Sequence, residues 1–352
     1  MEFLPEFFFS AWMGRPAWVW VGFLVIVAAL MILDLGIMHK PGKVIDVRES
    51  IVMCAFYTAL GLAFAAVIYW IYSQPMSAES IDGQFAGLSD HKRAMMAAQL
   101  YVTGYLVELS LSMDNVFVIS LIFGYFHIPR QHQHRVLFWG IIGVILFRAA
   151  LIGVGAALIS QFSWVMSVFG VFLVYAGVKM MRASEDHNPD IANNPVLRYI
   201  RGHFPVTHDL HGESFFIRQT DPKTGRMLSY MTPLFLALVM VELADVVFAV
   251  DSVPAIFAIT PDSYLVYTSN IFAILGLRSL YFTLAAMVHR FHYMKYALAL
   301  ILVLIGAKIL VAELGGLHLP NWVSLAATVG LLAGGIGYSL LKTRAAEKAA
   351  SL

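Results

Sequence analysis

Five carboxylates lie inside two apolar stretches of the sequence, ELSLSMDN at residues 108–115 and ELADVVFAVDS at residues 242–252. They are Glu108, Asp114, Glu242, Asp245 and Asp251. A shift of 137 positions superposes the acids of the first stretch on the last two acids of the second. A carboxylate in the middle of a bilayer costs about 2.5–3.5 kcal/mol, so acids in such surroundings need a compensating charge or a function. Together with the side chain of Asn115 they form a set of hard oxygen ligands, which suits Mn²⁺, Ca²⁺ or Mg²⁺.

Two arginines, Arg148 and Arg278, lie near the centres of other apolar segments and are the candidate counter-charges. If each of them neutralises one acid, an excess of three acids remains. That excess predicts a site for a cation or for protons. Asp34 and Ser112 are candidate residues of the path that leads to this site.

Straight helices would not bring all of these acids together, because residues six positions apart diverge by about 120° around a helix axis. Pro254 cannot donate a hydrogen bond to the carbonyl of Val250, so we expect the helix to kink or unwind beside Asp251. We expect the polar run from Ser110 to Asn115 to open the other helix in the same way.

The chain as a whole is too apolar for a soluble domain, since 60% of its 352 residues are hydrophobic, 13% are charged and the mean hydropathy is +0.76. We therefore interpret it as a protein of the lipid bilayer. A net charge of +1 argues against nucleic acid as a partner. The single Cys54 excludes an intramolecular disulfide and a CxxC site. The sequence contains no HExxH, P-loop or nucleophile elbow, so we expect neither enzymatic activity nor a prosthetic group.

Nine apolar segments are long enough to span a bilayer as α-helices. They cover residues 17–38, 50–72, 94–126, 135–160, 164–181, 230–259, 262–288, 294–313 and 320–342. The sequence therefore predicts an all-α polytopic membrane protein. The third segment is longer than one straight crossing needs, which leaves room for a tilt or a break near its middle.

The distribution of positive charge predicts the orientation in the membrane. With nine spans the termini lie on opposite faces, and the connections carry sixteen Lys and Arg residues on the face of the C-terminus against three on the other. We expect a multi-pass protein of the inner (plasma) membrane with its N-terminus outside and its C-terminus in the cytosol.

The two acidic stretches belong to a longer internal repeat. FLVYAGVKMM at 172–181 parallels ILVLIGAKIL at 301–310, and Arg148 parallels Arg278. Spans three to five thus repeat as spans six to eight, and because each unit has an odd number of crossings the two units are inverted. The expected organisation is a two-helix segment with an extracytoplasmic loop at 1–93, the first repeat at 94–181, a cytosolic loop at 182–229, the second repeat at 230–313, and a final helix with a cytosolic tail at 314–352.

The cytosolic loop contains most of the polar residues of the chain. Its segment SFFIRQTDPKTGRMLSY at 214–230 places a turn-rich DPKTG between two short alternating runs, which predicts a β-hairpin. Two histidine-rich runs, HIPRQHQHR at 127–135 and HFPVTHDLHGE at 203–213, lie on the same face. Such runs are typical of polar loops, and a role in metal collection or pH sensing is the alternative.

At these residues the sequence resembles the TerC family, and most closely its Alx-type bacterial members. The resemblance rests on the blocks GYLVELSLSMDNVFVISLIF, MVELADVVFAVDSVPAIFAIT, TSNIFAILGLRSLYF and VLIGAKIL, and it extends from about Ala17 to the last span. It implies an integral membrane protein related to the lysine-exporter-type fold and associated with manganese export, alkaline-pH response and tellurite resistance. Carried over by motif, the metal-handling residues are Glu108, Asp114, Asn115, Glu242, Asp245 and Asp251.

We therefore expect a secondary transporter that exports a divalent cation from the cytosol by alternating access around the acidic site. The resemblance favours Mn²⁺, whereas the residues alone fit Ca²⁺ equally well. Protons are the candidate coupling ion, because protonation of clustered carboxylates would displace a metal. Two alternatives remain: a transporter of a tellurium oxyanion bound at Arg148 and Arg278, and a membrane-protein assembly or scaffold factor with the cytosolic loop as its partner surface.

Overall fold

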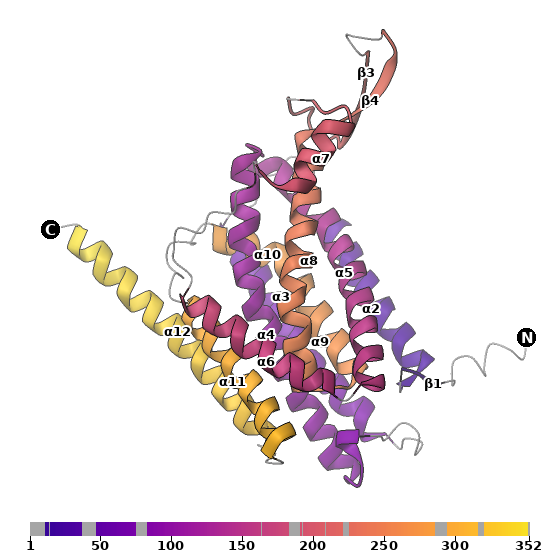
Figure 1. Cartoon of the computed structure of the whole chain (residues 1–352), viewed down its shortest axis with the longest axis vertical. Helices are drawn as coiled ribbons and strands as arrows, with labels where there is room; N and C mark the ends of the chain where they lie inside the picture. Colours follow the sequence, from indigo (N-terminus) through magenta and orange to yellow (C-terminus); the bar gives the residue numbers. More distant parts are fainter. Residues whose placement is uncertain are drawn as a thin grey trace, which may run out of the picture.

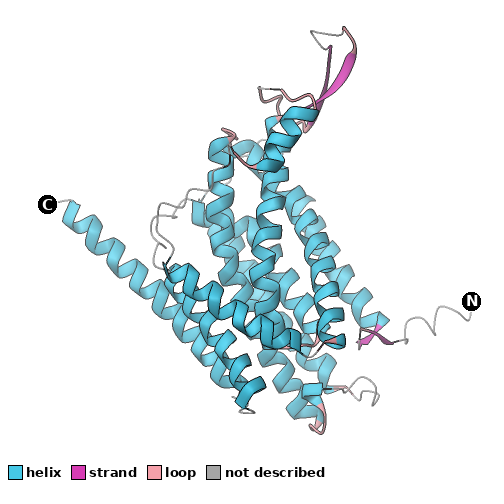
Figure 2. Ribbon diagram, viewed as in Figure 1, coloured by secondary structure: helices cyan, strands magenta, loops and turns pink. Residues whose placement is uncertain are grey.

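The computed structural model of the chain consists almost entirely of helices (Figure 2). It describes residues 11–13, 15–36, 47–74, 83–162, 164–182, 191, 193–207, 209–220, 225–285, 294–315 and 320–350. The long helices are α2 (Ala17–Gly36), α3 (Val47–Ser73), α4 (Asp90–Tyr125), α5 (Arg130–Gln161), α6 (Trp164–Arg182), α8 (Pro233–Ile259), α11 (Met294–Gly315) and α12 (Asn321–Ala350). Two shorter helices, α9 (Ser263–Leu275) and α10 (Leu277–Ala285), follow one another between α8 and α11.

Each predicted span coincides with one of these helices or, for the segment 262–288, with the pair α9 and α10. Seven described helices are long and apolar enough to cross a membrane, and the bent pair makes an eighth. The apolar helix at Ala17–Leu33 is shorter. The all-α polytopic architecture is thus confirmed, whereas the ninth span and the orientation that depends on it stay predictions.

The remaining elements are short. Strands β1 (Ala11–Trp12) and β2 (Arg15–Pro16) pair antiparallel before α2, and a 3₁₀ turn, η2 (Gly83–Phe85), precedes α4. Helix α7 (Pro195–His203) leads to strands β3 (Phe216–Thr220) and β4 (Met227–Met231), which pair antiparallel. The predicted β-hairpin is therefore confirmed, and its connection at 221–224 lies outside the described residues.

Neither acidic helix is unwound, which corrects that part of the sequence-based prediction, whereas a kink within α8 stays a prediction. Helix α8 continues through Pro254, which is buried among neighbouring helices that hold the chain in place. Helix α4 is also unbroken, and the Ser110 hydroxyl donates to the carbonyl of Leu106 within the same helix at 2.5 Å. Among the described helices the sharp bend lies instead at Gly276, where α9 and α10 meet at 42°.

Helix α4 occupies the centre of the bundle, packed against α3, α8, α9 and α12. Helix α5 packs against α8 and α9, and α6 packs against α11. In Figure 1, α6, α11 and α12 form one side of the molecule, while α7 and the hairpin project from one end. Helix α8, which carries three of the acids, therefore packs against both α4, the helix of Glu108, and α5, the helix of Arg148.

The crossing of α6 and α11 repeats the same contact in both directions. A Cβ on Gly177 of α6 would lie 2.6 Å from the carbonyl oxygen of Ala299, and a Cβ on Gly306 of α11 would lie 2.7 Å from the carbonyl oxygen of Gly170. The shift that aligns FLVYAGVKMM with ILVLIGAKIL superposes Gly177 on Gly306 and Gly170 on Ala299. This reciprocal contact is what a two-fold axis between inverted units would produce. The repeat over its full length stays a prediction.

Gly177→Ala is expected to lower the free energy of unfolding by about 1–3 kcal/mol, because the added methyl group forces two backbones apart. Thermal unfolding in detergent measures the effect. The matched control is Gly330→Ala in α12, where an added Cβ has nothing within 4 Å and alanine favours the helix. Equal melting temperatures of Gly177→Ala and the wild type would contradict close contact at this crossing.

Candidate functional site

Arg148, near the middle of α5, is buried, and its guanidinium connects α5 to three other helices. Its Nη1 donates to Glu108 of α4, to Ser252 Oγ of α8 at 3.2 Å and to Asn270 Oδ1 of α9 at 3.0 Å. Its Nε and Nη2 donate to the two carboxylate oxygens of Asp245, at 3.2 and 3.1 Å. The sequence predicted Arg148 as the counter-charge of one acid, and in the structure it binds two carboxylates with its single positive charge. The reason is that α4 and α8 both pack beside its guanidinium.

Two amide side chains complete this Arg148 cluster. Asn270 Nδ2 donates to Glu108 Oε2 at 3.4 Å, and Asn115 Nδ2 donates to Asp245 Oδ1 at 3.3 Å. Glu108 is 0% exposed and Asp245 is 5% exposed, so both carboxylates depend on these donors rather than on water. Each acid is therefore bound by the arginine and by one amide.

The spacing of residues on α4 and α8 explains why these side chains meet. Glu108 and Asn115 are seven positions apart, as are Asp245 and Ser252, so each pair lies on one face of its helix. The shift of 137 positions superposes the first pair on the second. Because α4 packs against α8, the two equivalent faces come together at Arg148.

Asn270 and Ser252 were missed by the sequence analysis as site residues. Asn270 is a buried amide in the apolar helix α9, within the block TSNIFAILGLRSLYF, and Ser252 follows Asp251 in the second acidic stretch. Ser252 could have been identified from the repeat, because it is the counterpart of Asn115 at the shift of 137 positions. No comparable signal exists for Asn270, whose role depends on how α9 packs against α4.

A cavity of about 310 Å³ lies next to the Arg148 cluster. Side chains from α4, α5, α6, α8 and α11 line it, and Asn115 and Arg148 belong both to its wall and to the cluster. Its other charged lining residues are Asp251 of α8 and Lys179 of α6. Asp251 therefore faces a space beside the cluster, while it takes part in none of the hydrogen bonds of Arg148 described above.

Of the remaining candidate acids, Glu242 lies apart from the cluster. Its carboxylate packs against Gly143 of α5, where a Cβ would collide with it, and its Oε2 is buried without a hydrogen-bond partner among the described residues. Asp114 lies in α4 and Asp34 in α2, but their side chains fall outside the described part of the chain. The structure thus brings together Glu108, Asp245 and Asn115 and separates them from Glu242.

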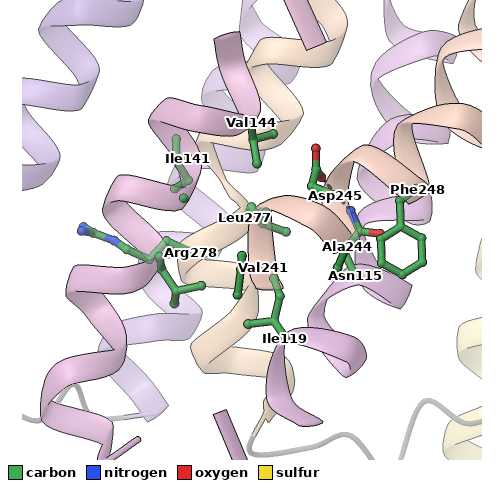
Figure 3. A pocket seen from close by; sticks show the side chains of 12 residues that line it. Asn115, Ile119, Ile141, Val144, Val241, Ala244, Asp245, Phe248, Leu277 and Arg278 are labelled. Carbon is green, nitrogen blue, oxygen red and sulfur yellow. Dashed lines mark hydrogen bonds between the residues drawn. The ribbon is translucent and has the colours of Figure 1, made fainter. Parts of the chain in front are cut away.

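Arg278, the second candidate counter-charge, is buried at the start of α10. It lines a small pocket of about 10 Å³ together with Asn115 and Asp245. Figure 3 shows Arg278 on the opposite side of this pocket from Asp245, with its guanidinium extended away from that carboxylate. The two arginines that the repeat equates therefore take different positions relative to Asp245.

Within the described residues, no three His, Cys, Asp or Glu side chains are arranged to hold a metal ion. At the start of α5, His132 Nδ1 and His134 Nε2 lie 4.0 and 3.8 Å from Glu213 Oε1, and Arg135 Nη1 lies 3.4 Å from Glu213 Oε2. These contacts fasten the segment before β3 to the membrane helices. His208, of the second histidine-rich run, lies outside the described residues.

Comparison with known proteins gives consistent matches over most of the chain. The family model described as "Integral membrane protein TerC family" matches residues 94–347. An "Uncharacterized membrane protein" of Rickettsia bellii is 42% identical over 329 residues, which cover 94% of this chain and 99% of that protein. The "Putative membrane-bound redox modulator Alx" of Escherichia coli K12 is 42% identical over 320 residues, which cover 91% of this chain and 92% of that protein. No solved structure matches the chain.

Proposed function

The chain belongs to the TerC family of integral membrane proteins. From this premise we propose that it is a secondary transporter that exports a divalent metal cation, Mn²⁺, from the cytosol. Transport proceeds by alternating access around the Arg148 cluster and the cavity beside it. The protein lies in the inner membrane with its N-terminus outside and its C-terminus in the cytosol. It has no enzymatic activity and carries no prosthetic group.

The observation that carries this proposal is a buried ionic cluster on the wall of a cavity, between equivalent faces of α4 and α8. Ionisable residues inside a membrane protein are costly, and they commonly mark an ion or substrate pathway. A site between repeated helices is also the typical place for a substrate in secondary transporters. A cavity of about 310 Å³ is large enough for an ion with part of its water shell.

The chemistry of the site favours a hard divalent cation. Glu108, Asp245 and Asp251 supply carboxylates, Asn115 and Asn270 supply amide oxygens, and sulfur from cysteine is absent from the cluster. Oxygen ligands of this kind suit Mn²⁺, Mg²⁺ and Ca²⁺. The choice of Mn²⁺ among them follows the resemblance to the manganese-exporting members of the family.

An anion carrier is less consistent with the geometry, because the donors of Arg148 are taken by Glu108, Asp245, Ser252 and Asn270. The printed name of the Escherichia coli relative mentions redox modulation. This chain contains one cysteine, Cys54, so any redox effect would not use an intrachain dithiol. Assembly or scaffold activity through the hairpin would leave the cluster without a role.

Reconstitution of the purified protein in proteoliposomes tests the proposal. We expect flux of Mn²⁺ that exceeds the flux of Mg²⁺ and Ca²⁺, and an increase of that flux by an opposing pH gradient if protons are the coupling ion. Empty liposomes are the control for leak. Absence of flux for all three cations, in a preparation whose melting curve shows folded protein, would contradict transport.

A further inference from the structure

Arg148 occupies a position that is built like the coordination shell of a cation. Five oxygen atoms from Glu108, Asp245, Ser252 and Asn270 surround its guanidinium, and the side chain is 1% exposed. Three of these oxygens, from three different helices, converge on Nη1 alone, although that nitrogen carries two N–H groups. Nη1 therefore has one more oxygen around it than it has N–H groups to donate.

The hydroxyl group of Ser112 is a second, independent observation on α4. It is 1% exposed, and its Oγ is buried without a hydrogen-bond partner among the described residues. It lies four positions after Glu108 and three before Asn115, and hence on the same face of α4. Buried hydroxyl groups normally find a partner, so Ser112 supplies an oxygen on this face of α4 that the hydrogen bonds of the described residues leave unused.

The cavity contains a second carboxylate that the guanidinium of Arg148 can bind. Arg148 and Asp251 line the same space of about 310 Å³, and Asp251 is half-buried there. A flexible arginine side chain that released Glu108 and Asp245 would meet another carboxylate without entering lipid. The cluster and Asp251 thus form two alternative partners for one buried positive charge.

We propose that Arg148 is an internal counter-cation that exchanges with the transported ion. A divalent cation takes the oxygens of Glu108, Asp245 and Asn270, while the guanidinium of Arg148 withdraws into the cavity to Asp251. Asn270 Oδ1, now 3.0 Å from Nη1, moves inward by about 1 Å or less to reach a metal-ligand distance from a cation at that place. This proposal rests on the function proposed above and assigns the ion its binding residues.

The charge balance supports the exchange. With Arg148 in the shell, two carboxylates face one positive charge, and Asp251 lies beside them. With a divalent cation in the shell, its two charges match Glu108 and Asp245, while Arg148 joins Lys179 beside Asp251 in the cavity. The carboxylates are never left without a cation, so the carrier can return across its cycle without obligatory binding of protons.

The test is the Arg148→Gln variant of the full-length protein, with thermal unfolding and electron paramagnetic resonance of added MnCl₂ as readouts. We expect a variant that is less stable than the wild type without metal, that MnCl₂ stabilises, and that binds Mn²⁺ at least about tenfold more tightly than the wild type because the competing charge is gone. Its Mn²⁺ flux is expected to fall although its binding tightens, which a merely structural role of Arg148 would not produce.

The matched control is Arg93→Gln, since Arg93 is also buried, but its guanidinium binds the carbonyls of Tyr72 and Gln74 and the carboxylate of Asp90. That variant should lose stability without any rescue by MnCl₂. Where Arg148→Gln fails to fold even when prepared with MnCl₂, Arg148→Met provides the same comparison, because methionine also removes the charge and its flexible apolar side chain fills much of the same space.

Unchanged or weaker Mn²⁺ binding by Arg148→Gln, or by Arg148→Met where the first does not fold, would overturn the exchange. This binding result can be distinguished from the result of the proteoliposome flux assay. Wild-type flux together with no gain in affinity would refute the exchange and leave the transport function in place. Tighter Mn²⁺ binding by the variant, together with no flux through the wild type, would support the competition between Arg148 and the ion and refute the transport function.

Discussion

Replacing Asp245 by alanine is expected to lower the free energy of unfolding by about 3–5 kcal/mol. Asp245 accepts two hydrogen bonds from the guanidinium of Arg148 and one from Asn115, and it is 5% exposed. Alanine removes both carboxylate oxygens and with them all three hydrogen bonds, so Arg148 keeps one carboxylate in surroundings that hold little water. Breaking one side of a buried ion pair is costly because the remaining charge stays desolvated, and here the side chain of Asn115 loses its partner as well.

The measurement is thermal or denaturant unfolding of the purified protein in detergent. Asp209→Ala is the control, since Asp209 is an exposed carboxylate outside the cluster, and we expect it to unfold like the wild type. The triple variant Glu108→Gln, Arg148→Met, Asp245→Asn removes all three charges together and is expected to recover most of the stability without Mn²⁺ flux. Wild-type stability of Asp245→Ala would show that the pair with Arg148 contributes little to the fold.

Much of the architecture could be predicted from local sequence, because a bilayer requires long apolar helices whose backbone groups are satisfied within each segment. The helices over Trp164–Arg182 and Pro233–Ile259 match the apolar runs closely, and the hairpin follows from alternation around DPKTG. These features depend on residues near one another in the chain. The central position of Glu108 and Asp245 was predictable for the same reason.

The partners of these acids could not be predicted from the sequence, because they depend on which helices become neighbours. Arg148 binds acids on α4 and α8 together with an amide on α9, a combination set by packing rather than by spacing. The helix bend was predicted at Pro254 on the chemistry of proline alone. Helix α8 is continuous there, since the surrounding helices hold Pro254 in place, and the break among the described helices lies at Gly276, which no local rule predicts.

The repeat connects the part that was predictable with the part that was not. A single shift superposes Glu108 on Asp245 and Asn115 on Ser252. Glu108, Asp245 and Ser252 accept from one guanidinium, and Asn115 donates to Asp245. The symmetry is broken by Arg148 itself, whose counterpart Arg278 is extended away from Asp245 (Figure 3). The oxygens come in two equivalent sets, whereas one arginine alone exchanges with the ion. The position of Arg148 therefore distinguishes two states of the carrier, one with the arginine among the oxygens and one with the ion there.

Asp251→Asn is expected to reduce Mn²⁺ flux in proteoliposomes by at least about tenfold while leaving the melting temperature close to that of the wild type. Asp251 lines the cavity and takes part in none of the hydrogen bonds of Arg148, so its charge contributes little to the fold in this state. In the exchange it becomes the partner of the displaced guanidinium.

The size of that effect follows from the charge alone, because asparagine has nearly the same shape as aspartate. Two unit charges about 4 Å apart interact by about 4 kcal/mol at the effective dielectric constant of a protein, and a loss of about 1.4 kcal/mol already slows a rate tenfold. Asp209→Asn, on the exposed loop, is the matched control and should transport like the wild type. Wild-type flux by Asp251→Asn would mean that Arg148 never leaves Glu108 and Asp245 for this carboxylate, whereas lost flux with intact folding and retained Mn²⁺ binding identifies Asp251 as the second position of the arginine.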